Sequence, residues 1–154
     1  MPAHPENDRF EPLIGEWSLA MVRVGEDRPD PLADVGARAS FAWMGDGAFV
    51  VQRWTVPVPE APNGLAVIGW NADRGACLQH YFDDRGVARV YEIDLVDGVW
   101  TMARTQADLM PLDFAQRFTG VFSADRNRID GTWEIAREGQ DWHKDFDLIY
   151  NRVG

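Results

Sequence analysis

Histidine is the side chain best suited to moving a proton near neutral pH, and the chain contains three: His4, His80 and His143. They lie far apart in the sequence without the ligand spacing of a zinc site, so we expect no metal centre. Residues two apart share one face of a strand, which groups His80 with Leu78 and Phe82 on the more apolar face of its segment. We therefore expect His80 to point inward, either satisfied by one buried protein partner or available to a ligand.

The single cysteine, Cys77, is the next reactive side chain. It stands at the start of a predicted strand beside a turn, and no serine or cysteine has the context of a nucleophile elbow. The sequence also contains no glycine-rich phosphate loop. Covalent catalysis therefore has poor support, and one cysteine cannot form an internal disulfide.

Long polar and aromatic side chains alternate with apolar ones on several segments. Arg89 shares a face with Tyr91, and Arg104 shares one with Met102. A buried arginine needs a partner, either an aspartate or glutamate of the protein or an acidic or carbonyl-bearing ligand. The residues that we expect to line the interior and bind a ligand are Trp43, Gln52, Trp54, His80, Arg89, Tyr91, Met102, Arg104, Gln116, Phe118 and Trp133.

The segments that must position these residues have the two-residue apolar periodicity of strands and end in Gly, Asp, Asn or Pro. Short polar turns such as 45–47, 83–86 and 97–98 separate them. We expect Phe118, Trp133, Phe146 and Leu148 to be buried. The predicted strands cover residues 15–24, 36–44, 48–57, 64–71, 76–83, 87–95, 98–106, 114–123, 128–137 and 141–152.

Three segments interrupt the strand pattern. Residues 8–14 predict a short helical turn with Asp8 as its N-cap. Residues 25–35 predict a long loop, because prolines and charges break both periodicities. Residues 106–113 predict a loop whose apolar side chains cover a pocket mouth or a subunit contact.

Ten successive strands without a long helix are best closed into a barrel, because an open sheet would leave two edges and one face uncovered. We therefore predict an all-β protein, a single antiparallel meander β-barrel of about ten strands that occupies residues 1–154 as one domain. A β-sandwich is the alternative, since alternation alone does not separate two packed sheets from one closed sheet.

The composition restricts the partners. The 154 residues carry a net charge of -10 with no basic run, which repels nucleic acid and anionic lipid headgroups. No apolar stretch is long enough to span a bilayer, and the N-terminus lacks a secretory signal, so the cytoplasm is the expected compartment. Seven tryptophans favour strands and an aromatic-lined cavity. A homodimer is left open.

The two ends of the chain carry a recognisable pair of motifs. The segment Gly15-Glu16-Trp17 resembles the Gly-x-Trp opening of lipocalin-like barrels, the calycins, and Arg152 resembles their closing arginine. This resemblance implies that Trp17 plugs the base of the barrel and that Arg152 lies across its indole in a cation–π contact. Segments 47–53, 80–83, 116–120 and 145–148 resemble a group of uncharacterised bacterial calycin-like proteins, nearly end to end.

Nitrobindins, ten-stranded haem-binding barrels, resemble the chain in the same opening and closing motifs. Their iron-ligating histidine lies seven residues before the closing arginine, where this chain has Asp145. His143 is the alternative haem ligand, two residues from that position. The apolar set of Trp142, Phe146 and Leu148 predicts, however, that His143 points outward. Residues 18–21 also lack the further glycines of the nitrobindin opening.

These observations lead to four hypotheses, the last of which is a barrel that is packed solid and acts only as an interaction scaffold. The first is a cytoplasmic barrel that binds a small apolar or amphipathic molecule without a cofactor. The second is a cyclase or isomerase in which His80, Tyr91 or Arg104 polarises a substrate held in the lumen. The third is a haem-binding protein with His143 or His80 on the iron.

Overall fold

The structure, a computed structural model, describes residues 4–23 and 36–154, so the loop predicted over residues 25–35 lies outside the described residues. The described residues form one 3-10 helix and ten strands, which confirms the all-β prediction. In chain order the elements are η1 (Pro5–Leu13), β1 (Gly15–Arg23), β2 (Arg38–Met44), β3 (Phe49–Thr55), β4 (Gly64–Asn71), β5 (Ala76–Asp83), β6 (Ala88–Val96), β7 (Val99–Arg104), β8 (Ala115–Phe122), β9 (Arg128–Ala136) and β10 (His143–Val153).

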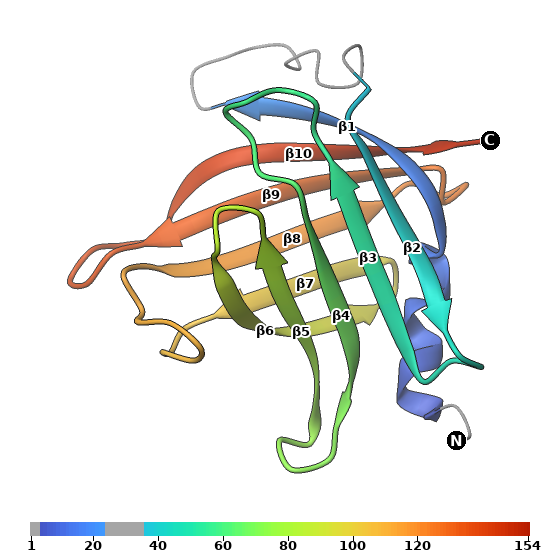
Figure 1. The fold of residues 1–154 in the computed structure, drawn as a ribbon, viewed down its shortest axis with the longest axis horizontal. Coiled ribbons are helices and arrows are strands. Elements are labelled where there is room, and N and C mark those ends of the chain that lie inside the picture. Colours follow the sequence, from blue (N-terminus) through green and yellow to red (C-terminus); the bar gives the residue numbers. More distant parts are fainter. Residues whose placement is uncertain (1–3, 24–35) are drawn as a thin grey trace.

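The ten strands form one closed barrel (Figure 1). Each strand pairs with the next in antiparallel fashion, and β10 pairs with β1 to complete the ring. The meander barrel is therefore confirmed, and the β-sandwich alternative is wrong. Every strand boundary lies within two residues of its predicted position. Among the described residues, no helix has the length and apolar character needed to cross a membrane.

Tight turns connect the hairpins as their sequences predict. Asp97 and Gly98 have φ angles of 53° and 75° between β6 and β7. Two successive residues in the left-handed region are typical of a two-residue type I′ turn, whose twist matches the twist of the flanking strands. The aspartate–glycine pair therefore fixes the register of this hairpin.

The helix η1 closes one end of the barrel. It begins at Pro5, and the Nδ1 atom of His4 accepts a hydrogen bond from the backbone amide of Glu6. The predicted N-cap at Asp8 is therefore wrong, because Pro5 at the first helical position favours a helix that begins one turn earlier. Phe10 and Leu13 of the helix are fully buried in the core. We call this the closed end.

The two terminal motifs, Gly15-Glu16-Trp17 and Arg152, lie together at the closed end. The Cζ atom of Arg152 lies 4.2 Å from the centroid of the Trp17 ring, which confirms the predicted cation–π contact. The Arg152 guanidinium also donates to the carbonyl oxygens of Ile14 and Pro12, each at 2.8 Å. Trp17 donates from Nε1 to the carbonyl of Leu13 at 2.8 Å. The first and last strands are thus joined to the helix by one set of contacts.

The inward-facing residues follow from the register, because residues paired across neighbouring strands share a face. Trp100, Phe118 and Ile129 mark the inward face on β7, β8 and β9, and all are fully buried. The ring of Phe118 lies over Gly131, where an added Cβ would be 2.5 Å from Phe118 Cε2. Of the four residues that we expected to be buried, Phe118 is fully buried, whereas Trp133, Phe146 and Leu148 are half-buried.

The prediction that His80 faces the lumen is wrong. Cys77, Gln79 and Tyr81 form the inward face of β5: Cys77 and Gln79 are buried, and Tyr81 packs on the core. His80 lies between Gln79 and Tyr81, so its side chain points to the outer face, beside Val67 and Val90 on the neighbouring strands. The prediction failed because it assigned the more apolar parity to the interior.

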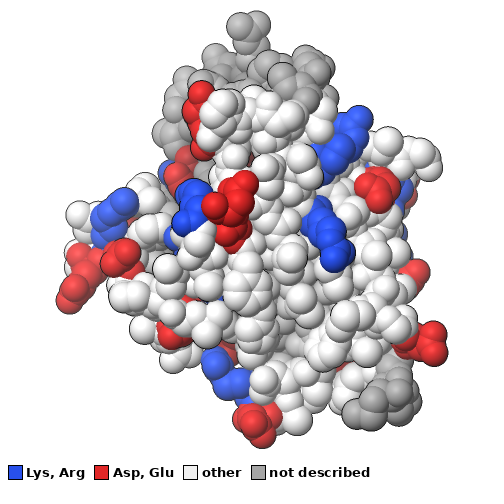
Figure 2. Space-filling view, in the orientation of Figure 1, with Lys and Arg blue, Asp and Glu red and all other residues white. Residues whose placement is uncertain are grey.

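The outer face of β3, β4 and β5 is unusually apolar. Phe49, Leu65 and Phe82 are exposed there, and Leu78, on the same side of the sheet, is buried. Figure 2 shows the same face, in which uncharged residues cover most of the area and charged ones are scattered. This surface explains the misleading pattern around His80. A homodimer remains a prediction.

A β-bulge changes the facing of residues at the start of β10. The register shifts between Lys144 and Phe146, so that His143 pairs with the inward-facing Ile135. The exposed His143 therefore lies on the lumenal side of the barrel edge, contrary to the outward facing that we predicted. Trp142, predicted to face inward, instead lies against Arg117, whose Cζ is 4.3 Å from the centroid of the indole.

Candidate functional site

The two ends of the lumen differ in burial. Near η1, the inward-facing Trp17, Phe41 and Trp100 are buried almost completely. At the opposite end, Trp54 and Trp133 are half-buried although they also point inward. We call this second end the mouth. Partly accessible aromatic side chains on the inside of a barrel are the common lining of a small-molecule site.

Five aromatic rings follow one another around the mouth. The Trp54 ring stacks on Tyr81 with centroids 5.1 Å apart, and the Tyr81 ring lies 6.2 Å from that of Tyr91. Tyr91 then contacts Trp133 at 5.7 Å, and Trp133 contacts Phe118 at 5.1 Å. We call these five residues the aromatic belt. The belt crosses strands β3, β5, β6, β8 and β9, so barrel closure assembles it from distant parts of the chain.

A glycine holds the first member of the belt in place. Gly64 pairs with Trp54 across β3 and β4, and a Cβ on Gly64 would lie 2.3 Å from Trp54 Cζ2. The indole therefore lies directly on the backbone of β4. Its Nε1 donates a hydrogen bond of 3.0 Å to the carbonyl of Pro62. These contacts orient the ring across the mouth, with its other side against Tyr81.

A buried carboxylate fixes the second member. The Tyr81 hydroxyl donates to Asp83 Oδ2 at 2.7 Å, and the Arg85 guanidinium donates to the same oxygen at 2.6 Å. Burial alone would raise the pKa of Asp83, but the hydrogen bonds from Arg85 and Tyr81 outweigh burial and lower it to about 2. Burial and the Asp83 hydrogen bond raise the pKa of Tyr81, so this phenol stays protonated.

Tyr91 occupies the centre of the belt and carries a hydrogen bond across the mouth. Its hydroxyl donates to Gln116 Oε1 at 2.7 Å. Burial raises the pKa of Tyr91, and the nearby Arg89 guanidinium partly opposes this effect. Tyr91 is therefore a neutral phenol at physiological pH, able to donate or accept a hydrogen bond but not to act as a base.

Arg104 is engaged by the protein. Its guanidinium donates to Asp108 at 2.8 Å and 3.0 Å and to the carbonyl oxygens of Met110 and Pro111. The hydrogen bond from Arg104 holds the pKa of Asp108 well below its usual range. Of the two predicted partners for this buried arginine, the structure supplies the aspartate. Arg104 therefore anchors the loop over residues 105–113 beside the mouth.

Three buried polar atoms deeper in the lumen have no hydrogen-bond partner among the described residues: Gln52 Oε1, Gln79 Oε1 and Trp100 Nε1. Gln52 lies beside the hydroxyl of Tyr150, whose pKa burial raises. An unsatisfied buried polar group costs about 1–3 kcal/mol, so such groups need a reason to persist. The lumen below the belt is thus polar at defined points rather than uniformly apolar.

The predicted lining residues separate into groups. Gln52, Trp54, Arg89, Tyr91, Gln116, Phe118 and Trp133 share the inward face at or just below the mouth. Met102 belongs to the buried core. Trp43 lies toward the closed end, where its Nε1 donates to Glu11 Oε2 at 3.0 Å. His80 is on the outer face.

Sequence reasoning missed four residues at the mouth: Tyr81, Asp83, Phe114 and Arg137. Tyr81 and Asp83 were assigned to the outer face of β5 through the parity error at His80. Phe114 and Arg137 stand just beyond the ends of β8 and β9 and continue the inward parity of Gln116 and Ile135. Counting that parity one step past each strand end would have found both.

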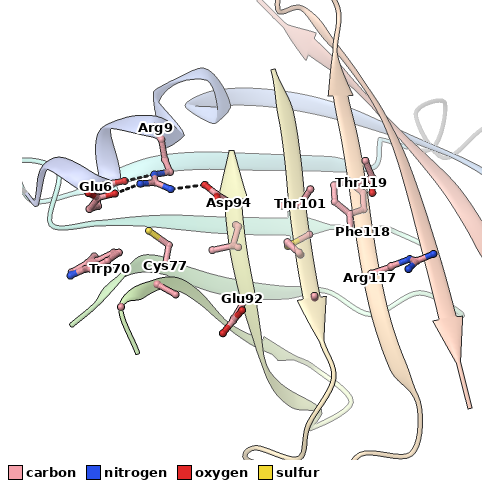
Figure 3. A pocket seen from close by; sticks show the side chains of 15 residues that line it. Glu6, Arg9, Trp70, Cys77, Glu92, Asp94, Thr101, Arg117, Phe118 and Thr119 are labelled. Atoms are coloured by element: carbon pink, nitrogen blue, oxygen red, sulfur yellow. Dashed lines mark hydrogen bonds and ion pairs between the residues drawn. The ribbon is translucent and has the colours of Figure 1, made fainter. Parts of the chain in front are cut away.

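A hollow of about 580 Å³ lies elsewhere, beside η1 and strands β5 to β8 (Figure 3). Its charged side chains are already paired, as Arg9 shows by bonding both Glu6 and Asp94. Burial raises the pKa of the Cys77 thiol at its edge, which keeps the sulfur protonated and unreactive. No group of three His, Cys, Asp or Glu side chains within the described ranges could hold a metal ion. The mouth is therefore the stronger candidate site.

No protein-family model and no curated protein sequence matches the chain. Among solved structures, the chain is similar to Rv2717c from M. tuberculosis, with a TM-score of 0.58 and 12% sequence identity. The similarity covers 99% of this chain and 100% of Rv2717c. At this identity the match extends to the fold alone.

Proposed function

We propose that the barrel binds a small apolar or amphipathic molecule through its mouth, with the ligand packed against the aromatic belt. The observation that carries this proposal is the half-buried state of Trp54, Tyr81 and Trp133, whose rings point into the lumen. Contacts from Gly64, Pro62 and Asp83 hold the first two rings in place before any ligand arrives. Pre-organised aromatic surfaces bind ligands with little loss of side-chain entropy.

The unsatisfied atoms of Gln52, Gln79 and Trp100 supply a second argument. A ligand that enters below the belt gains hydrogen bonds to groups that the protein leaves unpaired. Such atoms give a lumen selectivity for a ligand with a complementary polar group, because a purely apolar occupant leaves them unsatisfied. The proposal therefore favours a mostly apolar ligand with a few polar atoms over a plain hydrocarbon.

Titration with N-phenyl-1-naphthylamine, a neutral apolar dye that fluoresces on leaving water, tests the proposal. We expect the folded protein to bind the dye with energy transfer from its tryptophans. Trp133→Ala removes one wall of the belt and should weaken binding about tenfold, equivalent to about 1.4 kcal/mol. Trp142→Ala is the matched control, because this half-buried indole lies on the outside against Arg117.

Two results contradict the proposal. One is the absence of dye binding by the folded wild-type protein; the other is an equal loss of binding in both tryptophan variants. Thermal unfolding of each variant shows that the comparison is made on folded protein. Native mass spectrometry of the purified protein would then identify any organic molecule that it retains.

Of the three residues proposed to polarise a substrate in a cyclase or isomerase, the structure leaves only one in a suitable position. His80 is on the outer face and Arg104 is held by Asp108, so only the neutral hydroxyl of Tyr91 faces the lumen without an ion-pair role. A cyclase or isomerase would have to work through Tyr91 as a hydrogen-bond donor. Binding without chemistry therefore has the stronger support.

A further inference from the structure

Two arginines meet on one phenyl ring at the mouth. The Cζ atoms of Arg89 and Arg137 each lie 5.5 Å from the centroid of the Phe114 ring. The two guanidinium groups are therefore no further apart than twice that distance. Arg89 pairs with Tyr81 of the aromatic belt, so it faces inward at the first layer of the lumen. Because both arginines contact this one ring, both guanidinium groups can reach a common point at the ring edge.

Within residues 4–23 and 36–154, these two arginines have no carboxylate partner. Neither Arg89 nor Arg137 forms an ion pair with any carboxylate of the described residues. Two acids at the mouth are already held by other arginines, since Asp83 is bound by Arg85 and Asp108 by Arg104. This arrangement exists in a chain with 25 acidic and 15 basic residues, where carboxylates are in excess.

The acidic chain neighbours of the pair do not change this picture. Asp113 precedes Phe114 and Glu138 follows Arg137, and both are exposed. Both lie beyond the strand ends, Asp113 in a bend and Glu138 in a turn, and neither forms an ion pair with Arg89 or Arg137. These two neighbouring carboxylates therefore leave the guanidinium groups of Arg89 and Arg137 without a direct ion pair.

Neutral donors extend the positive edge toward the belt. Tyr91 donates to Gln116 Oε1, which leaves the amide hydrogens of Gln116 available to a ligand. Arg89 lies close to the hydroxyl of Tyr91. Arg89 and Gln116 thus both lie next to members of the aromatic belt, and Arg137 shares the Phe114 ring with Arg89.

We propose that the ligand is an amphipathic anion whose single carboxylate, sulfonate or phosphate group lies between Arg89 and Arg137 at the edge of Phe114, with its apolar body on the aromatic belt. This inference rests on the proposed function, because it assigns the polar end of the same ligand. A guanidinium group donates two parallel hydrogen bonds to such an oxyanion, so two arginines satisfy it fully.

A matched pair of dyes tests the charge requirement. 8-Anilinonaphthalene-1-sulfonate has the same rings as N-phenyl-1-naphthylamine and differs from it by one sulfonate. We expect the wild-type protein to bind the sulfonate at least about tenfold more tightly at low salt, against the general repulsion of a protein with net charge -10. Raising the ionic strength should reduce this preference, since salt screens the arginines.

Variants locate the effect. Arg89→Gln and Arg137→Gln should each weaken binding of the sulfonate dye about fivefold, and the double variant more than tenfold, with the neutral dye unaffected. Arg53→Gln is the control: it removes the same charge from an exposed position on β3, outside the lumen. Thermal melts confirm that the variants are folded.

The outcomes distinguish the two levels of the argument. Equal affinity for both dyes, or an unchanged sulfonate affinity in the double variant, overturns the anionic ligand and leaves the proposed function standing. If the double variant loses binding of both dyes, the arginines maintain the structure of the mouth, and the anionic-ligand proposal is also overturned. If neither dye binds to the wild-type protein, both proposals are overturned.

Discussion

At the closed end, Trp17 is fully buried, donates to the carbonyl of Leu13 and is covered by the guanidinium of Arg152. At the mouth, Trp54 donates to the carbonyl of Pro62 and stacks on Tyr81, yet it stays half-buried. Both indoles point inward, and both have a satisfied nitrogen. They differ in how much of the ring is covered by protein, which is all of it for Trp17 and part of it for Trp54.

This difference indicates that the two ends of the barrel have different roles. At the η1 end, the Trp17 side chain is packed in the core and contacts both the helix and the last strand. At the mouth the same residue types are held from one side only, by Gly64 and by the Tyr81–Asp83 hydrogen bond. Variants at the closed end should therefore change stability most, and variants at the mouth should change ligand binding more than stability.

The largest expected effect is at Trp17. Trp17→Ala removes a fully buried indole, its hydrogen bond to Leu13 and the surface on which Arg152 lies. Such a truncation costs about 3–5 kcal/mol of unfolding free energy. Urea unfolding would measure the loss, and dye affinity per folded molecule should change little. A large change in affinity with unaltered stability would show that the two ends are not independent.

The next effect lies between the two ends, where Phe118 covers Gly131. Gly131→Ala places a methyl group against the ring, and overpacking of this kind costs about 1–3 kcal/mol. Phe118→Leu in the same chain should restore part of the loss, because the smaller side chain leaves room for the methyl. A double-mutant cycle in urea measures this coupling. Additive losses would mean that the ring and the glycine are not in contact.

A pH-dependent effect is expected at Asp83 in the mouth. Its folded-state pKa of about 2 lies below the unfolded value of about 3.9. The carboxylate therefore stabilises the fold above about pH 4, and this contribution is lost as the pH falls toward 2. Asp83→Asn should cost about 1–2 kcal/mol at pH 7 and much less near pH 2.

Unfolding curves of wild type and Asp83→Asn between pH 2 and pH 7 provide the measurement. Asp46→Asn, at an exposed position in the β2–β3 turn, serves as control and should show no comparable difference. A stability difference that stays constant across this pH range would remove the ionised Asp83 from the account of the mouth.

The smallest effect is expected at His80. Because this side chain is on the outer face, His80→Ala should change stability by less than about 0.5 kcal/mol and leave dye binding unchanged. Tyr81→Ala, one residue further along β5, removes a ring of the belt and should reduce both by a measurable amount. Weaker dye binding in the His80 variant would return this residue to the lumen and reverse the facing of β5.

The sequence predicted the order and bounds of the strands because two-residue periodicity and Gly–Asp turns are local signals. The prediction of which side chains point into the barrel depended on a further assumption, that the more apolar set of alternating residues on each strand faces the interior. This assumption held on β8, where Phe118 is buried, and failed on β5, where Gln79 points inward and Leu78 and Phe82 point outward. A lumen with its own polar groups, beneath an apolar outer face, defeats a rule based on hydrophobicity.

Two further features were beyond local reasoning. The bulge at Asp145 exchanges the facing of Trp142 and His143, and no residue type in that segment announces it. The pairing of Arg104 with Asp108 depends on the fold of the loop over residues 105–113. The sequence predicted the kind of partner, a carboxylate of the protein or of a ligand, but not the residue. The Trp17–Arg152 contact, by contrast, was predicted correctly from the two terminal motifs.

The pairing of β1 with β10 has a consequence for synthesis of the chain on the ribosome. β1 emerges early, and one of its edges stays without a partner until β10 has been made, roughly 120 residues later. At about 5–20 residues per second this delay is on the order of ten seconds. During that time an apolar edge strand is available to other chains. Cellular yield should therefore depend more on chaperones that bind nascent strands than the stability of the finished barrel suggests.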